Sequence, residues 1–560
     1  MLAIVKSEGD MVNVAKQSFI FKKHMTIGEA DAEHDEQFLS ECFIDIGDYE
    51  VIEDTDSPQS IILGRTGIGK SALIEQIEKN VDRVIRIEPE ALALRHVSNS
   101  TILKFFESLG VNLDIFYNLL WQHTFAVELI KHKYNIDSAQ AKRNFIDTLT
   151  SLFSGNYKKQ QALNYIEEWG DKFWADTETR IKEFTDKLES NLRSSIDANV
   201  PGVRVSAQSG SSLTEEQKTE VVYYGKKVVS TVQIEKLSKI VNLLADDIFN
   251  DPQKKVYILI DRLDENWVDD DLRYKLIKAL IETIKKFRTI KPVKIIITLR
   301  TDLLNRVLEK TKDSGFQPEK YNSFYLRMSW NEIQLKSLLD KRINQLLKHK
   351  YTNSSVYFDD IFPNKIDNST SINYIIERTL LRPRDAIIFV NECLIEAQGK
   401  TEISNSIIKK AEQTYSQGRL DSLKFEWQVE HPMLDTYINL LRGRNNRFKV
   451  NSIQDEELDS LILDLAETID SSSDAAAKTA HSYMKSEYPA TKNLLTQFKQ
   501  NVLFILYKIG VVGIKVDGKT SVKWSHDRTQ SLTAQKIDSA SIVYVHKMLW
   551  RSLAIDNRGA

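Results

Sequence analysis

Short apolar segments alternate with amphipathic stretches over the first part and again near the middle of the chain, and this alternation predicts the fold class. The apolar segments are rich in Ile, Val and Leu and too short for buried helices, which is typical of buried strands. Helical periodicity lies between them, over residues 72–79 and 272–287. The predicted strands are residues 60–63, 83–88, 255–260, 293–299 and 324–328. Strands that alternate with helices form parallel sheets, so we expect an α/β core.

The pattern changes between about residues 100 and 250, where charged and aromatic residues recur at helical spacing. This stretch predicts a large helical insertion into the sheet. Residues 199–202 and 209–212 interrupt it with Pro, Gly and Ser, which indicates a flexible or hairpin-like break. The chain is again mostly helical after residue 330.

The last segment reads as a helix from residue 493, followed by alternating residues 510–516 and an Asp517-Gly518 turn. A second alternating run, 520–524, and a closing helix come next. Because Asp-Gly between two alternating runs is a strong hairpin signal, we expect a winged-helix-like module here.

Composition narrows the class of protein. The 560 residues are 42% hydrophobic and 28% charged, with only 20 Gly and 10 Pro, which excludes a chain that is disordered or collagen-like throughout. The net charge of −3 gives no chain-wide positive field for nucleic acid, and two cysteines are too few for a disulfide framework. Apolar runs are far shorter than the ~20 residues of a membrane helix, and the first residues do not resemble a secretory signal. We therefore expect a cytoplasmic, multidomain protein without membrane contact.

A glycine-rich segment after the first predicted strand matches the pattern G-x-x-x-x-G-K-[ST]. Its glycines let backbone amides converge on phosphates, and the helix that follows adds its positive N-terminal end. Lys70 in this pattern reaches the β- and γ-phosphates, and the Ser71 hydroxyl ligates Mg²⁺. The predicted nucleotide contacts are Gly64, Arg65, Thr66, Gly67, Ile68, Gly69, Lys70, Ser71 and Ala72. A chance match is the alternative, but it would not bring the strand before and the helix after the loop.

An acidic segment ends the predicted strand 255–260 and supplies the second part of such a site. Asp261 is expected to hold the Mg²⁺ shell. Asp264 and Glu265 follow closely enough to orient and deprotonate an attacking water, and we favour Glu265 as the base. The alternative is a solvated acidic loop.

Arg300 follows the strand 293–299 at its carboxyl end, where open α/β sheets bind ligands. It is therefore a candidate sensor of the γ-phosphate, and an ion pair with Asp302 is the alternative.

Arg382 and Arg384 lie where a predicted helix begins. Cations are unfavourable at helix N-termini unless they face an anion, so one of these arginines is a candidate lid contact to phosphate. Pairing with Asp385 or Glu377 is the alternative.

These elements, in this order, resemble the AAA+/STAND branch of P-loop ATPases. Residues 258–265 look like the hhhhD-x-hD-E motif of STAND and NACHT-type ATPases, and residues 298–300 and 382–385 resemble their sensor arginines. The lead-in from Asp35 to residues 42–45 also resembles bacterial P-loop ATPases found near phage-defence genes. The resemblance implies ATP and Mg²⁺ as cofactors, a homo-oligomer and a protein effector.

The chain departs from that family pattern in three places. The insertion is atypical of a compact core, Arg262 replaces the usual glycine of the acidic motif, and no unambiguous arginine finger is visible. Arg306 is a candidate finger, with a helix-surface charge as the alternative.

The resulting division is an N-terminal extension, a P-loop core in two parts, a helical insertion, a lid, a helical region and the winged-helix-like module. Their bounds are 1–55, 56–95 plus 250–330, 96–249, 331–400, 401–492 and 493–560. The leading hypothesis is an Mg²⁺-dependent switch ATPase that controls assembly or an effector, in bacterial phage defence. The alternatives are a DNA-associated ATP-driven machine, with DNA contact through residues 442–449 or the C-terminal module, and a non-hydrolysing ATP-bound scaffold.

Overall fold

A computed structural model describes most of the chain and divides it into two compact units. The sheet unit comprises residues 45–329, and the helical unit comprises residues 1–44 and 330–560. The described residues are 20–92, 97, 99–135, 147, 177–200, 213–231, 240–311, 317–348, 355–465, 474–486, 490–526 and 532–557. The predicted break at 209–212, and part of that at 199–202, lie outside them.

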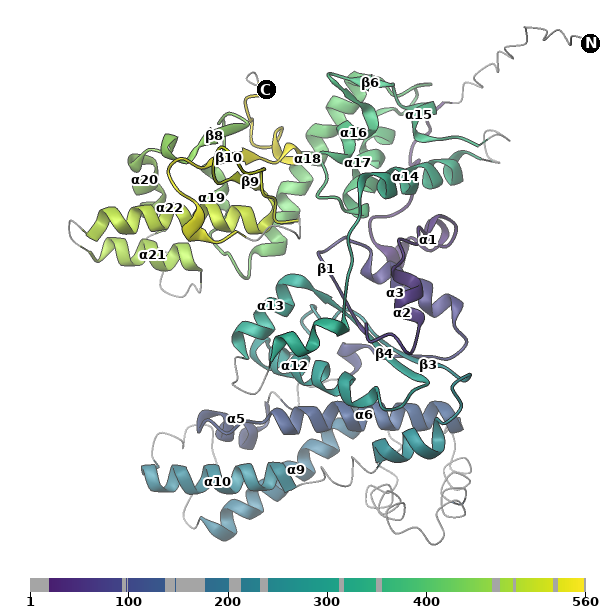
Figure 1. Ribbon diagram of the computed structural model, residues 1–560, viewed down its shortest axis with the longest axis vertical. Helices are drawn as coiled ribbons and strands as arrows, with labels where there is room; N and C mark the ends of the chain where they lie inside the picture. Colours follow the sequence, from purple (N-terminus) through teal and green to yellow (C-terminus); the bar gives the residue numbers. More distant parts are fainter. Residues whose placement is uncertain are drawn as a thin grey trace, which may run out of the picture. The chain divides into compact units, whose positions relative to one another are not determined.

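The sheet unit is built on five parallel strands in the order β2-β3-β4-β1-β5. Figure 1 labels β1, β3 and β4 of this sheet. The strands are β1 (Ile61–Gly64), β2 (Val84–Arg86), β3 (Val256–Ile260), β4 (Val293–Arg300) and β5 (Tyr325–Arg327). Central strands β1, β3 and β4 are buried almost throughout, which explains why their sequences are continuous apolar runs. The predicted α/β class and all five strands are confirmed.

Helices cover both faces of this sheet. The chain moves from β1 to β2 in one direction along the sheet, and from β3 through β4 to β5 in the other, so right-handed crossovers put α3 on one face and α12 and α13 on the other. The helices and turns of this unit are α2 (Asp48–Glu53), α3 (Lys70–Asn80), η2 (Pro89–Leu92), α5 (Thr101–Ser108), α6 (Asp114–Tyr134), α9 (Thr177–Asn199), α10 (Glu215–Thr231), η5 (Leu244–Ile248), α12 (Asp270–Phe287), α13 (Thr301–Lys310) and η6 (Pro318–Phe324).

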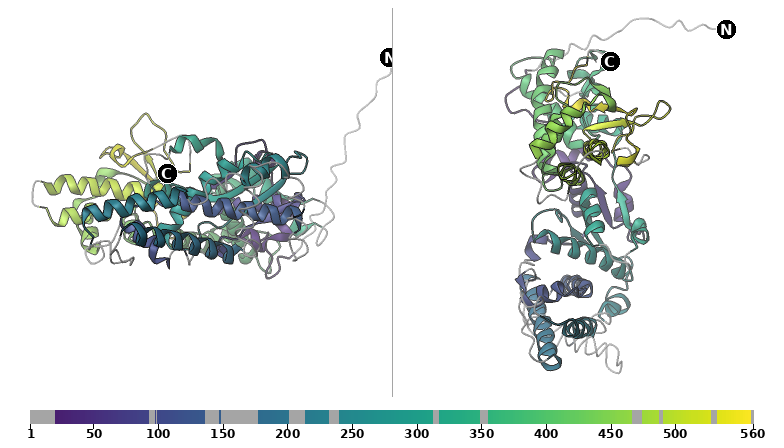
Figure 2. Two further views of the ribbon diagram at one scale, coloured as in Figure 1. Left: turned by 90° about the horizontal axis from the view of Figure 1, so that it is seen from below. Right: turned by 90° about the vertical axis from the view of Figure 1, so that its left-hand side faces the viewer.

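The helical insertion belongs to the same core as the sheet. Helices α6, α9 and α10 run side by side (Figures 1 and 2), and α6 packs along α12. The buried Trp121 of α6 donates a hydrogen bond to the carbonyl of Leu276 in α12 at 2.9 Å. Lys278 and Asp114 add a 2.5 Å ion pair between the same helices. The insertion is thus part of the sheet unit and not a separate body.

The helical unit combines the N-terminal segment with the chain after residue 330. The buried pair Arg342–Asp35 (2.5 Å) fixes that segment against α14, and Phe21 pairs through its backbone with residues 399 and 400. The elements up to residue 427 are η1 (Ala32–His34), α1 (Glu36–Cys42), α14 (Glu332–Leu347), α15 (Phe358–Ile361), β6 (Lys365–Ile366), β7 (Ser369–Thr370), α16 (Ser371–Ile376), α17 (Pro383–Glu396) and α18 (Asn405–Trp427).

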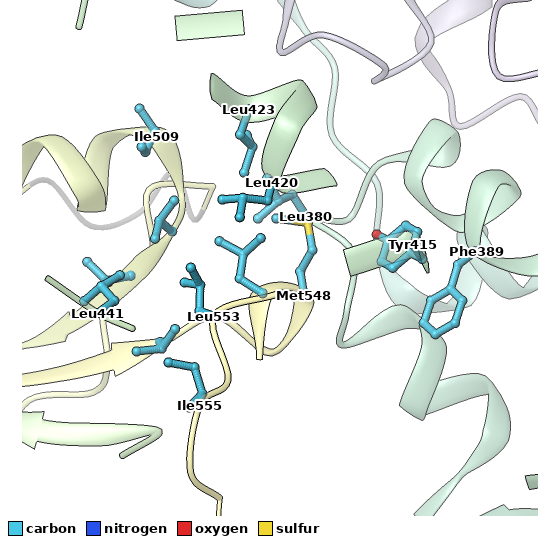
Figure 3. Packing of buried hydrophobic residues seen from close by; sticks show 14 of the residues in the cluster. Leu380, Phe389, Tyr415, Leu420, Leu423, Leu441, Ile509, Met548, Leu553 and Ile555 are labelled. Atoms are coloured by element: carbon cyan, nitrogen blue, oxygen red, sulfur yellow. The ribbon is translucent and has the colours of Figure 1, made fainter. Parts of the chain in front are cut away.

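The end of the chain forms a three-stranded antiparallel sheet, β8-β10-β9, with helices beside it. Its elements are α19 (Leu434–Asn439), β8 (Arg447–Lys449), η7 (Val450–Ser452), α20 (Asp455–Leu465), α21 (Ala475–Met484), α22 (Ala490–Ile509), β9 (Val512–Lys515), η9 (Ala534–Lys536), β10 (Ile542–Val545) and η10 (Lys547–Leu549). This sheet and the helices before it share one apolar core, in which Leu380 and Leu420 lie beside Met548 (Figure 3).

Two details predicted for this end are wrong. Residues 520–524 form a single bridge, Ile514 to Lys523, and the partner strand of β9 is β10. The predicted closing helix is replaced by β10 and short 3-10 turns. None of the described helices is long and apolar enough to cross a membrane.

Candidate functional site

The glycine-rich loop, residues 64–71, connects β1 to α3 and has the backbone that its glycines allow. Gly67 and Gly69 adopt φ of 76° and 104°, in the region that disfavours other residues. At Gly64 the constraint is space, because a Cβ would lie 2.5 Å from Cγ2 of Ile68. The loop therefore delivers backbone amides and the N-terminus of α3 to one point at the carboxyl end of β1.

Lys70 begins α3, and the carboxylates that act on it most strongly follow the end of β3. Its Nζ donates a hydrogen bond to the Arg65 carbonyl at 3.3 Å. Burial lowers the pKa of the Lys70 ammonium, and the carboxylates of Asp264 and Asp261 oppose that shift. These charges act on Lys70 because β3 and β4 end at the same edge of the sheet as β1.

Asp261 lies at the end of β3 and is 7% exposed. Its Oδ1 accepts hydrogen bonds from the Thr298 hydroxyl of β4 and from the Arg262 amide. Its Oδ2 is buried and, among the described residues, has no hydrogen-bond partner. A buried carboxylate oxygen left open beside a phosphate-type loop fits the Mg²⁺ role predicted for Asp261.

Asp264 and Glu265 follow in a tight turn and face different groups. Asp264 lies 3.8 Å from the Arg300 guanidinium, whereas Glu265 lies 3.8 Å from Arg262. Both carboxylates are exposed enough to reach water. Burial raises the pKa of Glu265 despite Arg262, and the neighbouring Glu90 and Asp264 raise it further.

Arg300 forms an ion pair with Asp302, which the sequence analysis gave as the alternative to sensing the γ-phosphate. Its guanidinium binds both carboxylate oxygens, at 3.1 and 2.9 Å, and Arg306 binds the same carboxylate at 2.9 Å. Burial would raise the pKa of Asp302, but the two guanidinium groups hold it below its ordinary value. Arg300 is half-buried, lies 3.8 Å from Asp264 and is one of the charges that act on Lys70. Arg306 is engaged within its own chain.

Three residues have roles in this site that were not predicted from the sequence. Thr298 holds Asp261, and the buried Arg273 of α12 donates hydrogen bonds to the carbonyls of Asp264 and Glu265 at 3.3 and 2.8 Å. Glu90, in η2 after β2, brings a third carboxylate to Glu265. Glu90 could have been found from the order of the strands. Strand β2 pairs in parallel with β3, so the residues after β2 lie beside the acidic loop after β3.

The comparisons with known proteins concern both units. Residues 333–424, from α14 into α18, match a family described as the FunZ-associated C-terminal helical domain. The chain is also similar to a protein of Escherichia coli (strain K12) named "Putative transposon gamma-delta 80.3 kDa protein". Identity is 23% over 553 residues, which cover 97% of this chain and 68% of the relative. The similarity therefore extends over the sheet unit as well as the helical unit.

Arg382 and Arg384, the candidate lid contacts, lie within the matched helical region. Arg382 is 2% exposed, with Glu426 at 3.5 Å, and Arg384 donates to the carbonyl of Ala30 at 2.9 Å. These contacts differ from the pairing with Asp385 or Glu377 considered from the sequence; Asp385 pairs with Arg419 and Glu377 pairs with Lys547. Their role toward phosphate stays a prediction.

The basic cluster 442–449 forms the turn before β8 and the strand itself. Arg444 pairs with Glu457 and lies over the Phe448 ring, whereas Arg447 and Lys449 are exposed on either side of the buried Phe448. Alternation along an edge strand thus presents two cations on one surface. Among the described residues, no group of three or more His, Cys, Asp or Glu side chains is arranged to hold a metal ion.

Proposed function

We propose that the sheet unit binds ATP and hydrolyses it with Mg²⁺, at the carboxyl edge of its parallel sheet. The observation that carries this proposal is the convergence of Lys70 with Asp261, Asp264 and Arg300 from two neighbouring strands. A glycine-rich loop alone would support only anion binding. A loop lysine beside two carboxylates and a half-buried arginine also supplies the groups that phosphoryl transfer to water requires.

Each group has a role that its surroundings support. The loop amides and Lys70 bind the β- and γ-phosphates, and the Ser71 hydroxyl with the open oxygen of Asp261 would hold Mg²⁺. The bound ion would neutralise charge on the phosphate oxygens. Glu265 or Asp264 accepts the proton of the attacking water, and Arg273 fixes the loop that carries both.

The same proposal gives the nucleotide a switching role between the two units. The chain passes between the units at 44–45 and again at 329–330, and the second passage follows β5, which pairs directly with β1. A change at the glycine-rich loop would therefore reach the helical unit through the hydrogen bonds between β1 and β5 and the chain that leaves β5. Control of a homo-oligomer or of an effector in phage defence rests on the family resemblance alone.

ATP turnover and nucleotide affinity test this proposal. Lys70→Ala should abolish both, while Lys79→Ala, which removes an exposed lysine from the last turn of the same helix, should leave both unchanged. If the wild-type chain binds nucleotide but does not hydrolyse it, the non-hydrolysing ATP-bound scaffold is the hypothesis that remains. Equal affinity of wild type and Lys70→Ala would refute the site itself.

A DNA-associated function is the second candidate, favoured by the transposon name of the E. coli relative and by the exposed Arg447 and Lys449. We propose that α19–α22 with β8, β9 and β10 form a winged-helix-like module that contributes to it. Binding should weaken steeply with salt, because phosphate contacts release counterions. Fluorescence anisotropy with labelled duplex and single-stranded DNA at low and high salt tests this, and absence of binding at low salt removes it.

A further inference from the structure

A hollow of about 590 Å³ lies within the helical unit, where the turn after α16 meets the C-terminal sheet. Its size is that of a site for one small molecule or one nucleotide. Aromatic rings line it from three segments, with Trp524 before β10, Tyr544 on β10 and Trp550 after η10. The sheet and helices around it share one apolar core, so both walls belong to one packed body (Figure 3).

The rings are fixed before any ligand arrives. Trp524 packs against the backbone of β9 at Gly513, where a Cβ would lie 2.6 Å from the indole. The buried His546 meets the Trp524 ring edge-on, with ring centroids 5.1 Å apart. Trp550 donates its indole N–H to the carbonyl of Val545 at 2.9 Å. Trp524 also stacks on His526, with ring centroids 5.8 Å apart, so a planar ligand would stack on the ring surface of Trp524 and Trp550 that stays partly exposed.

Cations and carboxylates both lie around the hollow, and the cations are placed near its buried His546. Burial and, after it, the charges of His526, Arg378, Lys547 and Arg382 together lower the pKa of His546 to about 3. Arg447 and Lys547 line the hollow directly. Two carboxylates line it too, Glu332 and Glu377, and Glu377 is paired with Lys547 at 2.5 Å.

We propose that this hollow binds one unstacked nucleotide of a single-stranded DNA, with the base against Trp524 and Trp550 and the backbone along Arg447. Stacking on aromatic side chains together with a cationic track is how single strands are bound. The exposed Lys449 extends the cationic surface along β8, which a polymer can use and a free nucleotide cannot. Exposed Glu332 can accept a hydrogen bond from an exocyclic amino group of the base.

This inference deepens the proposed DNA association and rests on it. The test is anisotropy of a labelled oligodeoxycytidylate with the full-length chain, accompanied by quenching of tryptophan fluorescence. Trp524→Leu, which removes a stacking surface, and Arg447→Glu, which reverses a charge beside the backbone, should each weaken binding about tenfold or more. Lys478→Glu makes the same charge change at an exposed lysine of α21 that does not line the hollow, and should have little effect.

The outcomes separate this inference from the proposals on which it rests. Single-strand binding that both variants retain overturns the hollow and leaves DNA association intact. Preference for duplex, or displacement by deoxycytidine 5′-monophosphate at equal nucleotide concentration, overturns the single-stranded occupant. No DNA binding beside intact ATP turnover removes both DNA proposals and leaves the ATPase. Thermal melting of each variant checks that it is folded. Because Arg447 is exposed, Arg447→Glu should stay folded, and its binding tests the hollow even if Trp524→Leu is unfolded.

Discussion

Asp264 and Glu265 are consecutive carboxylates with different neighbours, and their isosteric amides should separate their roles. Glu265→Gln should reduce turnover by about 10²–10⁴-fold while ATP affinity stays the same, because only the proton acceptor is lost. Asp264→Asn removes the carboxylate beside Lys70 and Arg300, so it should change ATP affinity as well. Single-turnover hydrolysis and equilibrium nucleotide binding measure the two effects. An inactive Asp264→Asn beside an active Glu265→Gln would reverse the assignment.

The acid limb of the pH profile should depend on Glu90. Burial and the carboxylates of Glu90 and Asp264 raise the pKa of Glu265 against the effect of Arg262. A base works only when unprotonated, so activity is lost as pH falls through this raised pKa. Glu90→Gln removes one of the raising charges and should shift the acid limb of kcat/KM to lower pH. Glu88→Gln, whose carboxylate binds Arg86 at 2.8 Å, is the control that should not shift it. An unshifted limb in Glu90→Gln would mean that Glu265 is not the titrating base.

Arg262 carries backbone strain that a glycine would relieve. Its φ of 58° lies in the left-handed region, where a non-glycine residue costs roughly 1 kcal/mol or more. This is the position at which the resembling ATPases have glycine. Arg262→Gly should therefore stabilise the sheet unit by about 0.5–1 kcal/mol in urea unfolding, after the loss of unfolded-state restriction is included. Arg262→Ala keeps the Cβ and loses the contact to Glu265, so an equal gain in that variant would contradict the explanation.

At the level of elements, the parallel sheet was predictable and the C-terminal sheet was not. Strands such as β3 and β4 are buried on both faces, so their short apolar sequences identify them without knowledge of their partners. The turn at Asp517 forms as expected, since its carboxylate accepts from the amides of Lys519 and Thr520. The residues after it still do not form a strand, because β10, further along the chain, pairs with β9 instead. Hairpin signals are local, whereas this pairing is not.

The candidate site divides in the same way. The loop residues were predictable because their spacing between one strand and one helix defines the motif. Asp261 was predictable because it directly follows the apolar sequence of β3. Thr298, Arg273 and Glu90 come from other elements, and only the order of the sheet brings them to the acidic loop. Strand β8 was hidden for another reason, since its Arg447 and Lys449 are the exposed charges of a short edge strand. From the sequence alone, exposed charges on both sides of one apolar residue are as typical of a solvated loop as of a strand.

At the scale of the whole molecule, the two units should respond to different perturbations. Arg342 and Asp35 join α14 to the N-terminal segment at 2.5 Å, with side chains only 5% and 2% exposed. Removing one partner of a buried pair costs about 3–5 kcal/mol, so Asp35→Asn should lower the melting temperature of the helical unit. A non-hydrolysable ATP analogue with Mg²⁺ binds the sheet unit and should raise only that unit's transition. Calorimetry of the full chain, with and without the analogue, measures both.

The neighbouring Glu36→Gln is the control for this experiment, because Glu36 is exposed in the first turn of α1 and should leave both transitions in place. Two transitions whose melting temperatures change independently would mean that nucleotide binding affects the helical unit only through the chain passages at 44–45 and 329–330. A single transition, raised by the analogue and lowered by Asp35→Asn, would mean that the units unfold cooperatively. Coupling through an interface is then required, and a switch would act by changing that interface rather than by loosening a tether.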